Sequence, residues 1–546
     1  MIADIVITEK SFGPKLLMSG IKFSIDDGEK VGVIGRNGVG KSTLFGILAG
    51  TDKDYSGDVI FKRGTVVVAT AQEHHAMGAT TVLQYVLQGL PEYSDLSHII
   101  ETYPETMGDD MKLIDEYTQA LMRFGDKDFY QIEEQIEREL DNFQLPGVAH
   151  RAFSTLSGGQ KRLVEVVKVM HSDAHLALVD EPTNHMDYIA KSQYVEWMKT
   201  AREAMLVITH DRDVLNEVDR IIELKDGDSV SYKGNYNAYL KQNAVSTGTQ
   251  MNDFEMVEKR IVNLKAKVID YQRLKEKSRN PGTIQKFKRL EETSRKELGE
   301  LQAKEKPTFW IDKDSAANLN YKVAAQYDKF KAKNIRMSLK GDESRSKHVL
   351  VTARNISLGY GDTPLFEGAN IDLREGEALE FRGRNGAGKT TLIKALLGDT
   401  TATRFEGDMT MDPHVRIGVY EQEVSPTYFD LPLEGAIERM YLDREMSISV
   451  TKIRNLLSDY LFNEGDAKTP VSRLSGGQKA RFQIIAMLAN DPQLLILDEP
   501  TNHLDLPSIE ELETALAKYS GAVIYVSHDG YFRKAIGGDV LQIGAK

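Results

Sequence analysis

The chain has 546 residues, 41% of them hydrophobic, which is enough for several globular domains. It contains no cysteine, which excludes disulfides and thiolate metal sites and fits a reducing compartment, and no apolar run approaches the roughly 18–20 residues of a membrane span. Its formal net charge of −13 at pH 7 argues against nucleic-acid binding over the whole surface, so such a partner would require a local basic patch.

The first elements in chain order lead to a glycine-rich loop. Residues 1–30 predict short antiparallel strands that carry Phe12, and the apolar run 31–34 predicts a buried strand. Residues 35–42 read GRNGVGKS and open a predicted helix, so backbone N–H groups and the helix dipole can surround a phosphate. The residues predicted to bind nucleotide are Gly35, Arg36, Asn37, Gly38, Val39, Gly40, Lys41, Ser42 and Thr43.

Every motif of the first half recurs in the second half in the same order. The sequence LSGGQ occupies 156–160 and 474–478, DEPTNH occupies 180–185 and 498–503, and His-Asp follows an apolar strand at 210–211 and 528–529. The second glycine-rich loop comprises Gly383, Arg384, Asn385, Gly386, Ala387, Gly388, Lys389, Thr390 and Thr391. We therefore predict a tandem duplication of α/β phosphate-loop domains, at 1–240 and 341–546, separated by residues 241–340.

The first copy is longer than the second in its middle part. Between Gln72 and Ser157 lie 84 residues, and between Gln422 and Ser475 only 52. The extra residues fall at about 90–140, where apolar residues recur at helical spacing and acidic residues are frequent. We expect a helical arm there, either a solvated projection or a surface for a partner.

A phosphate loop binds nucleotide but needs other groups for hydrolysis. Asp180 and Asp498 end apolar strands and are predicted to hold Mg²⁺ together with Ser42 of the first loop and Thr390 of the second. Glu181 and Glu499 follow them directly. We expect these glutamates to polarise the attacking water; the alternative, that the Asp-Glu pair only caps the next helix, is weakened by its recurrence.

Two further residue types complete each predicted catalytic set. His210 and His528 each follow a third apolar strand and are predicted to contact the γ-phosphate. A single histidine there would more often be structural, but two at matching places favour a function. Gln72 and Gln422 follow short strands and are predicted to contact the metal and the water.

The segment 241–340 predicts an antiparallel helical hairpin. Apolar residues from Val257 to Tyr271 alternate by four and three, as along the seam of a coiled coil, and residues 279–282 read RNPG, a turn signal. A second helix is expected from about 283 to 305, with Phe287, Leu290, Leu298 and Leu301 facing back.

The end of this hairpin is strongly basic. It carries one acid, Glu276, and the following basic residues: Arg273, Lys275, Lys277, Arg279, Lys286, Lys288 and Arg289. Lys and Arg on a projecting tip suit binding to a phosphate backbone, so we predict RNA contacts for these seven residues. The alternative is a charged spacer without a nucleic-acid partner.

The complete set of motifs resembles the ATP-binding-cassette superfamily, in which LSGGQ lies between the phosphate loop and the Asp-Glu strand. The resemblance implies ATP and Mg²⁺ as cofactors, ATP hydrolysis, and stacking of Phe12 and Tyr360 on adenine rings. It also implies composite sites, in which each phosphate loop faces the LSGGQ segment of the other copy. The residues so implied are Ser157, Gly158, Gly159, Gln160, Ser475, Gly476, Gly477 and Gln478.

Two cassettes without a membrane span, joined by a basic hairpin, resemble the ABC-F translation factors. The resemblance implies a cytoplasmic monomer that binds the ribosomal exit site and directs the hairpin toward P-site tRNA, rRNA and the peptidyl-transferase centre. A role in general translation, in rescue or in antibiotic protection is left open by the sequence. The alternatives are a DNA-associated ATPase, disfavoured because no long coiled coil follows residue 528, and a transporter motor, for which the basic hairpin has no role.

Overall fold

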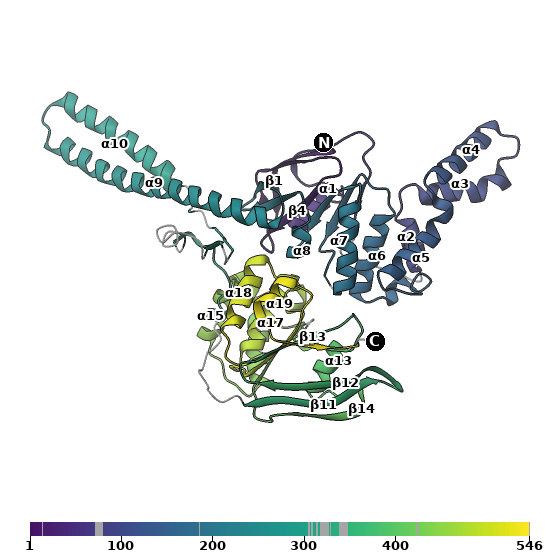
Figure 1. Ribbon diagram of the computed structural model, residues 1–546. Coiled ribbons are helices and arrows are strands. Elements are labelled where there is room, and N and C mark those ends of the chain that lie inside the picture. The colour runs from purple at the N-terminus through teal and green to yellow at the C-terminus, as the bar shows by residue number, and fades with distance from the viewer. Residues whose placement is uncertain are drawn as a thin grey trace. The chain divides into compact units, whose positions relative to one another are not determined.

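The computed structural model describes residues 1–13, 15–70, 80–184, 186–303, 306, 309–312, 315–316, 327, 329–337, 348–421 and 424–544. The chain divides into two compact units (Figure 1). One combines Met1–Tyr236 with Ile335–Lys546 and contains both copies of the motifs, called here the first and second repeat. The other is Asn237–Asn334. Within the described residues, no helix is long and apolar enough to cross a membrane.

The first repeat is built on a six-stranded sheet whose strand order is β10-β9-β4-β8-β7-β6. All neighbouring strands are parallel except β9 and β10. The bounds are β4 (Lys30–Gly35), β6 (Val67–Ala69), β7 (Leu176–Asp180), β8 (Ala204–Ile208), β9 (Arg220–Lys225) and β10 (Asp228–Lys233). Every residue of β7 and β8 is buried, as expected for central strands of a parallel sheet covered on both faces.

The second repeat has a five-stranded parallel sheet in the order β15-β16-β17-β13-β18. This is the order of β6, β7, β8, β4 and β9, so the predicted α/β duplication is confirmed at the level of topology. The bounds are β13 (Ala378–Arg382), β15 (Ile417–Tyr420), β16 (Leu494–Asp498), β17 (Ala522–Val526) and β18 (Asp539–Gln542). In both repeats the predicted site residues follow the carboxyl ends of strands that lie side by side, where α/β sheets bind ligands.

Each repeat also carries an antiparallel sheet, which the sequence predicted for residues 1–30 of the first. In the first repeat it comprises β1 (Ala3–Phe12), β2 (Lys15–Met18), β3 (Ile21–Ile25) and β5 (Ser56–Phe61). In the second it comprises β11 (Val349–Tyr360), β12 (Thr363–Arg374) and β14 (Thr403–Met411). Ile5 from β1, Val33 from β4 and Leu44 from α1 (Lys41–Leu48) share one buried core, which fixes the phosphate loop between the two sheets.

Helices cover the sheets and form a lobe in each repeat. The first repeat has α2 (Val82–Gln88), α5 (Ile132–Asn142), α6 (Gly158–Met170), α7 (Tyr188–Thr200) and α8 (Arg212–Leu215). The second has α13 (Lys389–Leu396), α14 (Leu433–Leu442), α15 (Val450–Asp459), α16 (Glu464–Ala467), α17 (Gly476–Leu488), α18 (Leu506–Ala517) and α19 (Gly530–Ile536). Helices α6 and α17 begin directly after Ser157 and Ser475, so each LSGGQ segment opens a helix.

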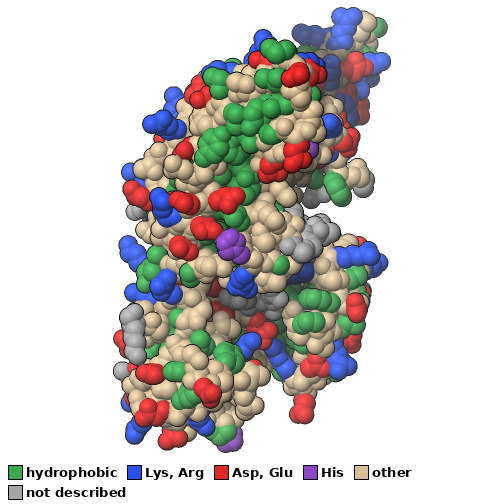
Figure 2. All heavy atoms as spheres, turned by 90° about the vertical axis from the view of Figure 1, so that its right-hand side faces the viewer, with side chains coloured by type: hydrophobic (Ala, Val, Ile, Leu, Met, Phe, Trp, Pro, Cys, Tyr) green, Lys and Arg blue, Asp and Glu red, His purple; other side chains and the backbone are tan. Residues whose placement is uncertain are grey.

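The range predicted as an arm contains two helices that lie side by side, α3 (Tyr93–Thr106) and α4 (Met111–Asp126) (Figure 1). Phe124 packs edge-on against Phe129, with 5.3 Å between ring centroids, and anchors α4 to the lobe. Met111 and Met122 of α4 are exposed. Figure 2 shows hydrophobic side chains gathered in a patch bordered by acidic ones on one face of the molecule.

The unit 237–334 contains the hairpin, formed by α9 (Tyr236–Lys277) and α10 (Pro281–Gln302) (Figure 1). Leu264 and Val268 are buried along the predicted seam. The second helix begins at Pro281, earlier than predicted, because Asn280 caps it by accepting hydrogen bonds from the N–H groups of residues 282 and 283.

One predicted seam residue is wrong. Leu290 is exposed, and Glu291 occupies the buried position instead. The Glu291 carboxylate is paired with Lys275, at 2.6 Å, and with Arg295, at 3.0 Å. These ion pairs allow a charged residue to take the inward position, so at this one point the buried residue lies one position after the one that the apolar pattern predicted.

Candidate active site

Both phosphate loops require glycine where the helix begins. Gly40 and Gly388 have φ of 107° and 99°, in the left-handed region. A Cβ atom on Gly40 would lie 2.5 Å from Leu17 Cδ2, and one on Gly388 would lie 2.9 Å from Phe366 Cδ1. At these two positions the loops therefore approach neighbouring side chains more closely than a residue with a Cβ atom could. The left-handed backbone there is suited to turning the N–H groups of the loop inward.

The loop lysines lie inside the loops. Lys41 Nζ donates to the carbonyl oxygens of Gly35, at 2.7 Å, and Arg36, at 3.3 Å. Lys389 Nζ donates to the equivalent carbonyls of Gly383 and Arg384, at 2.8 and 3.0 Å. Burial lowers the pKa of both lysines. A phosphate within reach would compensate the buried ammonium groups, so the loops fit an anionic ligand.

The predicted metal ligands meet as hydroxyl–carboxylate pairs. Ser42 Oγ donates to Asp180 Oδ2 at 3.2 Å, and Thr390 Oγ1 donates to Asp498 Oδ2 at 2.8 Å. Burial raises the pKa of Asp498 to about 6. Mg²⁺ is commonly held by one or two such oxygens together with water and substrate phosphates, so the pairs fit this ion.

The two predicted glutamates are held in an unusual backbone conformation. Glu181 has φ of 46° and Glu499 has φ of 51°, a region that non-glycine residues seldom occupy outside constrained sites. Their N–H groups donate to the carbonyls of Ile208, at 2.8 Å, and Val526, at 3.0 Å, on the neighbouring strands. Burial raises the pKa of Glu181 to about 8 and that of Glu499 to about 7.

The predicted histidines lie against these glutamates. His528 donates its N–H to Glu499 Oε2 at 3.2 Å, and its Nε2 lies 3.2 Å from Oε1. In the first repeat the His210 Nε2 atom lies 3.6 Å from Glu181 Oε1. Burial lowers the pKa of both histidines to about 3, so they are neutral near pH 7. His210 Nδ1 is buried without a hydrogen-bond partner among the described residues, which leaves a polar atom for a ligand.

The aromatic residues predicted to stack on adenine are solvent-accessible. Phe12 at the end of β1 is 77% exposed, and Tyr360 at the end of β11 is 50% exposed. The Tyr360 hydroxyl lies 3.5 Å from Thr391 Oγ1 beside the second phosphate loop. Neither ring belongs to a core, so both have a face available for a base.

The LSGGQ serines and glutamines cap their helices. Ser157 Oγ and Ser475 Oγ accept the N–H groups of Gln160 and Gln478, each at 3.3 Å. The glutamine side chains accept the serine N–H groups in return, completing a capping box. Within the described part of the chain the serine hydroxyls donate no hydrogen bond and could donate to an anion, whereas the glutamine amide oxygens are engaged by the capping.

The LSGGQ segment of the second repeat touches the phosphate loop of the first. A Cβ atom on Gly477 would lie 2.1 Å from Asn37 Nδ2. Asn37 Nδ2 donates to the His503 carbonyl at 2.9 Å. The two segments that the resemblance placed in one composite site therefore lie in contact.

Sequence reasoning missed two aspartates that join the repeats. Asp187 caps α7 and accepts the N–H of Asn385 at 3.1 Å, while Asp505 caps α18 and accepts the N–H of Asn37 at 3.3 Å. Each aspartate thus binds the phosphate loop of the other repeat. The signal was an N-cap residue seven positions after each strand-end aspartate, but a cap alone does not indicate a second partner.

The remaining predicted residues lie elsewhere or outside the described part. Gln72 and Gln422 are not among the described residues. At the hairpin end Lys275 is paired with Glu291, and it is only 32% exposed. The other predicted RNA contacts are exposed: Arg273, Lys277, Arg279, Lys286, Lys288 and Arg289.

The comparisons with known proteins agree with this geometry. The family model described as ABC transporter matches residues 18–184 and 366–502, which together exceed half of the chain. The fold is similar to that of an archaeal ribosome recycling factor, aABCE1, solved in complex with the ribosomal stalk protein aP1. The TM-score is 0.57 at 18% identity, covering 97% of this chain and 86% of that one.

Three curated relatives match nearly the whole chain. Ribosome protection protein VmlR of Bacillus subtilis is 28% identical over 94% of this chain and 81% of its own. ABC transporter F family member 5 of Arabidopsis thaliana is 29% identical over 98% and 74%. The energy-dependent translational throttle protein EttA of Mycobacterium tuberculosis is 28% identical over 96% and 88%.

The raised pKa values of the glutamates predict that the ligand-free protein loses stability as the pH rises. A glutamate in the unfolded chain has a pKa near 4.5. The contribution of the protonated glutamates to folding stability is therefore complete below pH 4.5, and it is lost as the pH rises through the folded-state pKa, about 7 for Glu499 and about 8 for Glu181. The E181Q/E499Q variant lacks this loss. Its melting temperature without Mg²⁺ or nucleotide should exceed the parent's by a margin that grows from about pH 5 to about pH 8.5; a constant margin would contradict the assignment.

The close approach at Gly477 predicts that alanine there disrupts the composite site. The added Cβ would displace Asn37, and a misplacement of about 1 Å can cost on the order of 10²-fold in rate. We expect G477A to lose most ATP turnover at an unchanged melting temperature. G299A is the matched control, since its Cβ would meet nothing within 4 Å. Normal turnover of G477A would show that the approach is not needed.

Proposed function

This chain belongs to the ABC transporter family and, within it, to the ABC-F proteins, and on that premise we propose that it acts on the ribosome. Membership of this family makes it an ATP-hydrolysing enzyme. In this proposal, ATP closes the two repeats and positions the basic hairpin near P-site tRNA, rRNA and the peptidyl-transferase centre, so that it modulates translation or protects against ribosome-targeting antibiotics. The protein would work as a cytoplasmic monomer at the exit site, with the domain boundaries 1–240, 241–340 and 341–546.

The proposed chemistry uses the same residue types twice. Lys41 and Lys389 would bind the β- and γ-phosphates, and the Ser42–Asp180 and Thr390–Asp498 pairs would hold Mg²⁺. ATP with this ion supplies the transferable phosphoryl group and part of its charge neutralisation. The raised pKa of Glu181 and Glu499 makes them suited to accept a proton near neutral pH from a bound water.

The sensor and closure roles follow from the remaining contacts. His210 and His528 are neutral, so they can donate a hydrogen bond to a phosphate oxygen without adding a charge. Gln72 and Gln422 would assist the metal and water. ATP bound between one phosphate loop and the opposite LSGGQ helix would favour the closed arrangement, and loss of the γ-phosphate would release it.

The observation that carries the ribosomal proposal is the exposed basic end of the hairpin. Six exposed cations lie there in a chain whose net charge is −13. Such a concentration suits contact with RNA phosphates, with an affinity that falls as salt rises. The names of the relatives VmlR and EttA point to the ribosome and to translation as the setting of those proteins.

The ribosomal proposal predicts that a hydrolysis-deficient variant accumulates on its target. E181Q/E499Q should bind ATP without hydrolysing it and stay closed. We expect it to co-sediment with ribosomes in the presence of ATP but not ADP, and to arrest translation when expressed. Sedimentation free of ribosomes at low salt, with ATP bound and hydrolysis lost, would remove the ribosomal function.

The basic hairpin end predicts a separation of RNA action from ATP turnover. R279E/K286E/K288E should weaken ribosome binding at moderate salt while ribosome-free ATP hydrolysis stays near the parent's rate, since these side chains lie outside the ATP sites. K259E/K265E/K296E makes the same change in charge on exposed lysines further along the same helices and serves as the matched control. If both variants lost ribosome binding equally, the change in net charge and not the position of the cations would be the cause, which would contradict the prediction.

A further inference from the structure

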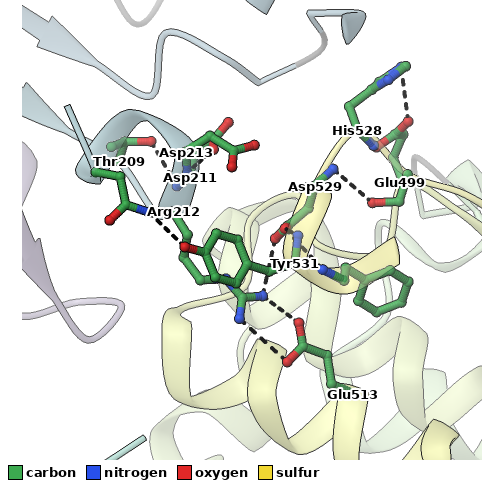
Figure 3. Close-up of polar contacts among 12 residues, drawn as sticks. Thr209, Asp211, Arg212, Asp213, Glu499, Glu513, His528, Asp529 and Tyr531 are labelled. Atoms are coloured by element: carbon green, nitrogen blue, oxygen red, sulfur yellow. Dashed lines mark hydrogen bonds and ion pairs between the residues drawn. The ribbon is translucent and has the colours of Figure 1, made fainter. Parts of the chain in front are cut away.

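A cluster of buried charges joins the two repeats beside the histidine-bearing loops (Figure 3). Arg212, two residues after His210, is only 5% exposed. Its guanidinium forms a two-point ion pair with Glu513 of the second repeat and lies 3.3 Å from Asp529 Oδ2. The guanidinium also lies over the Tyr531 ring, 4.8 Å from its centroid. All three partners belong to the other repeat.

A second cation from the first repeat reaches the same place. Lys191 of α7 pairs with Asp211 at 2.9 Å and with Asp213 at 2.5 Å, both in its own repeat. Its Nζ also donates to the His528 carbonyl at 3.3 Å. The carboxylates around Arg212 and Lys191 outweigh the effect of burial and raise the pKa of both groups, so both stay charged.

The repeat is broken at these positions. Residues 157–210 of the first repeat align with residues 475–528 of the second at a constant offset of 318 residues. At that offset Arg212 corresponds to Gly530, Lys191 corresponds to Ile509, and Val195 corresponds to Glu513. Position 530 of the second repeat thus carries no side chain, and a Cβ atom there would lie 3.4 Å from Asp213 Oδ2 of the first repeat.

The contacts of Arg212 lead directly to the second ATP site. Asp529 caps α19 by accepting the N–H groups of residues 531 and 532, which fixes the end of the loop that presents His528. His528 in turn contacts Glu499 through both its N–H and its ring. The corresponding loop of the first repeat is held by Lys191 of that same repeat. Among the described residues, Asp529 in the second histidine-bearing loop therefore forms its ion pair with a cation of the opposite repeat, whereas Asp211 in the first forms its ion pair within its own repeat.

From this one-sided arrangement we propose that Arg212 is a positioning residue for the ATP site containing Glu499 and His528, and that hydrolysis at that site depends on this contact with the first repeat. The site containing Glu181 and His210 does not depend on it. The two ATP sites are thereby made unequal by a charge pair that lies outside the residues predicted to bind nucleotide. This inference rests on the proposed catalytic roles of the glutamates but not on any action at the ribosome.

The test measures the first turnover at each site separately, by rapid quench of the full-length chain with Mg-ATP and without ribosomes. E181Q leaves the second site to hydrolyse, and E499Q leaves the first. Adding R212Q to E181Q should lower the maximal rate by about tenfold or more, because small misplacements of catalytic groups are costly, while the half-saturating ATP concentration changes by less than about twofold. Adding R212Q to E499Q should leave both parameters within about twofold of that parent.

Further variants separate positioning from folding. R212K keeps the charge but cannot pair at two points, so it should fall between the parent and R212Q. R212Q could unfold the protein by leaving Glu513 buried without its partner, and R212Q/E513Q removes both charges together. The double variant should show the same loss confined to the second site.

Three results would overturn the inference. An equal loss in both backgrounds would mean that Arg212 only holds the repeats together. No loss in either background would mean that Arg212 does not affect hydrolysis at either site. Loss of the first turnover in E181Q or E499Q alone would show that the sites do not hydrolyse separately, and would refute their inequality; failure of ribosome binding would leave the inference untouched.

Discussion

The structure depends on burying acidic groups at the carboxyl ends of two parallel sheets. Glu181, Asp498 and Glu499 all have raised pKa values because burial outweighs the lysines nearby. In both repeats the glutamate is also held at an unfavourable backbone angle by its hydrogen bond to the neighbouring strand. Without a ligand, burial disfavours the ionised form of these carboxyl groups. A bound cation with polyphosphate would therefore offset part of the free-energy cost that burial and backbone strain impose on the site.

The same strand ends connect each site to the opposite repeat. Seven residues after each strand-end aspartate, Asp187 and Asp505 bind the phosphate loop of the other half, and Gly477 approaches Asn37 too closely for any side chain. Arg212 adds a charged contact that only one repeat supplies. Sequence symmetry thus produces two similar sites, whereas a few substitutions at the junction make their surroundings different.

Much of the site was predictable because its chemistry fixes residue types at short spacings. The phosphate loops, the strand-end carboxylates and the histidines each occur in local motifs, and their order predicted the α/β duplication. The partners of Asp187 and Arg212 lie 198 and 301 or more residues away, and no local pattern encodes such a contact. Leu290 was misplaced because ion pairs allowed Glu291 to take the inward position, which an apolar pattern cannot reveal.

The central claim is that nucleotide holds the two repeats together, and a chain without cysteine allows a direct test. Asn216 Nδ2 donates to the Tyr531 hydroxyl at 2.7 Å, from the first repeat to the second and outside the residues predicted to bind nucleotide. In N216C/Y531C with E181Q/E499Q, a short thiol cross-linker should join these two positions rapidly with ATP and slowly with ADP or no nucleotide, as read by mass spectrometry of the linked peptides. A cross-linking rate that ignores the nucleotide would contradict the account.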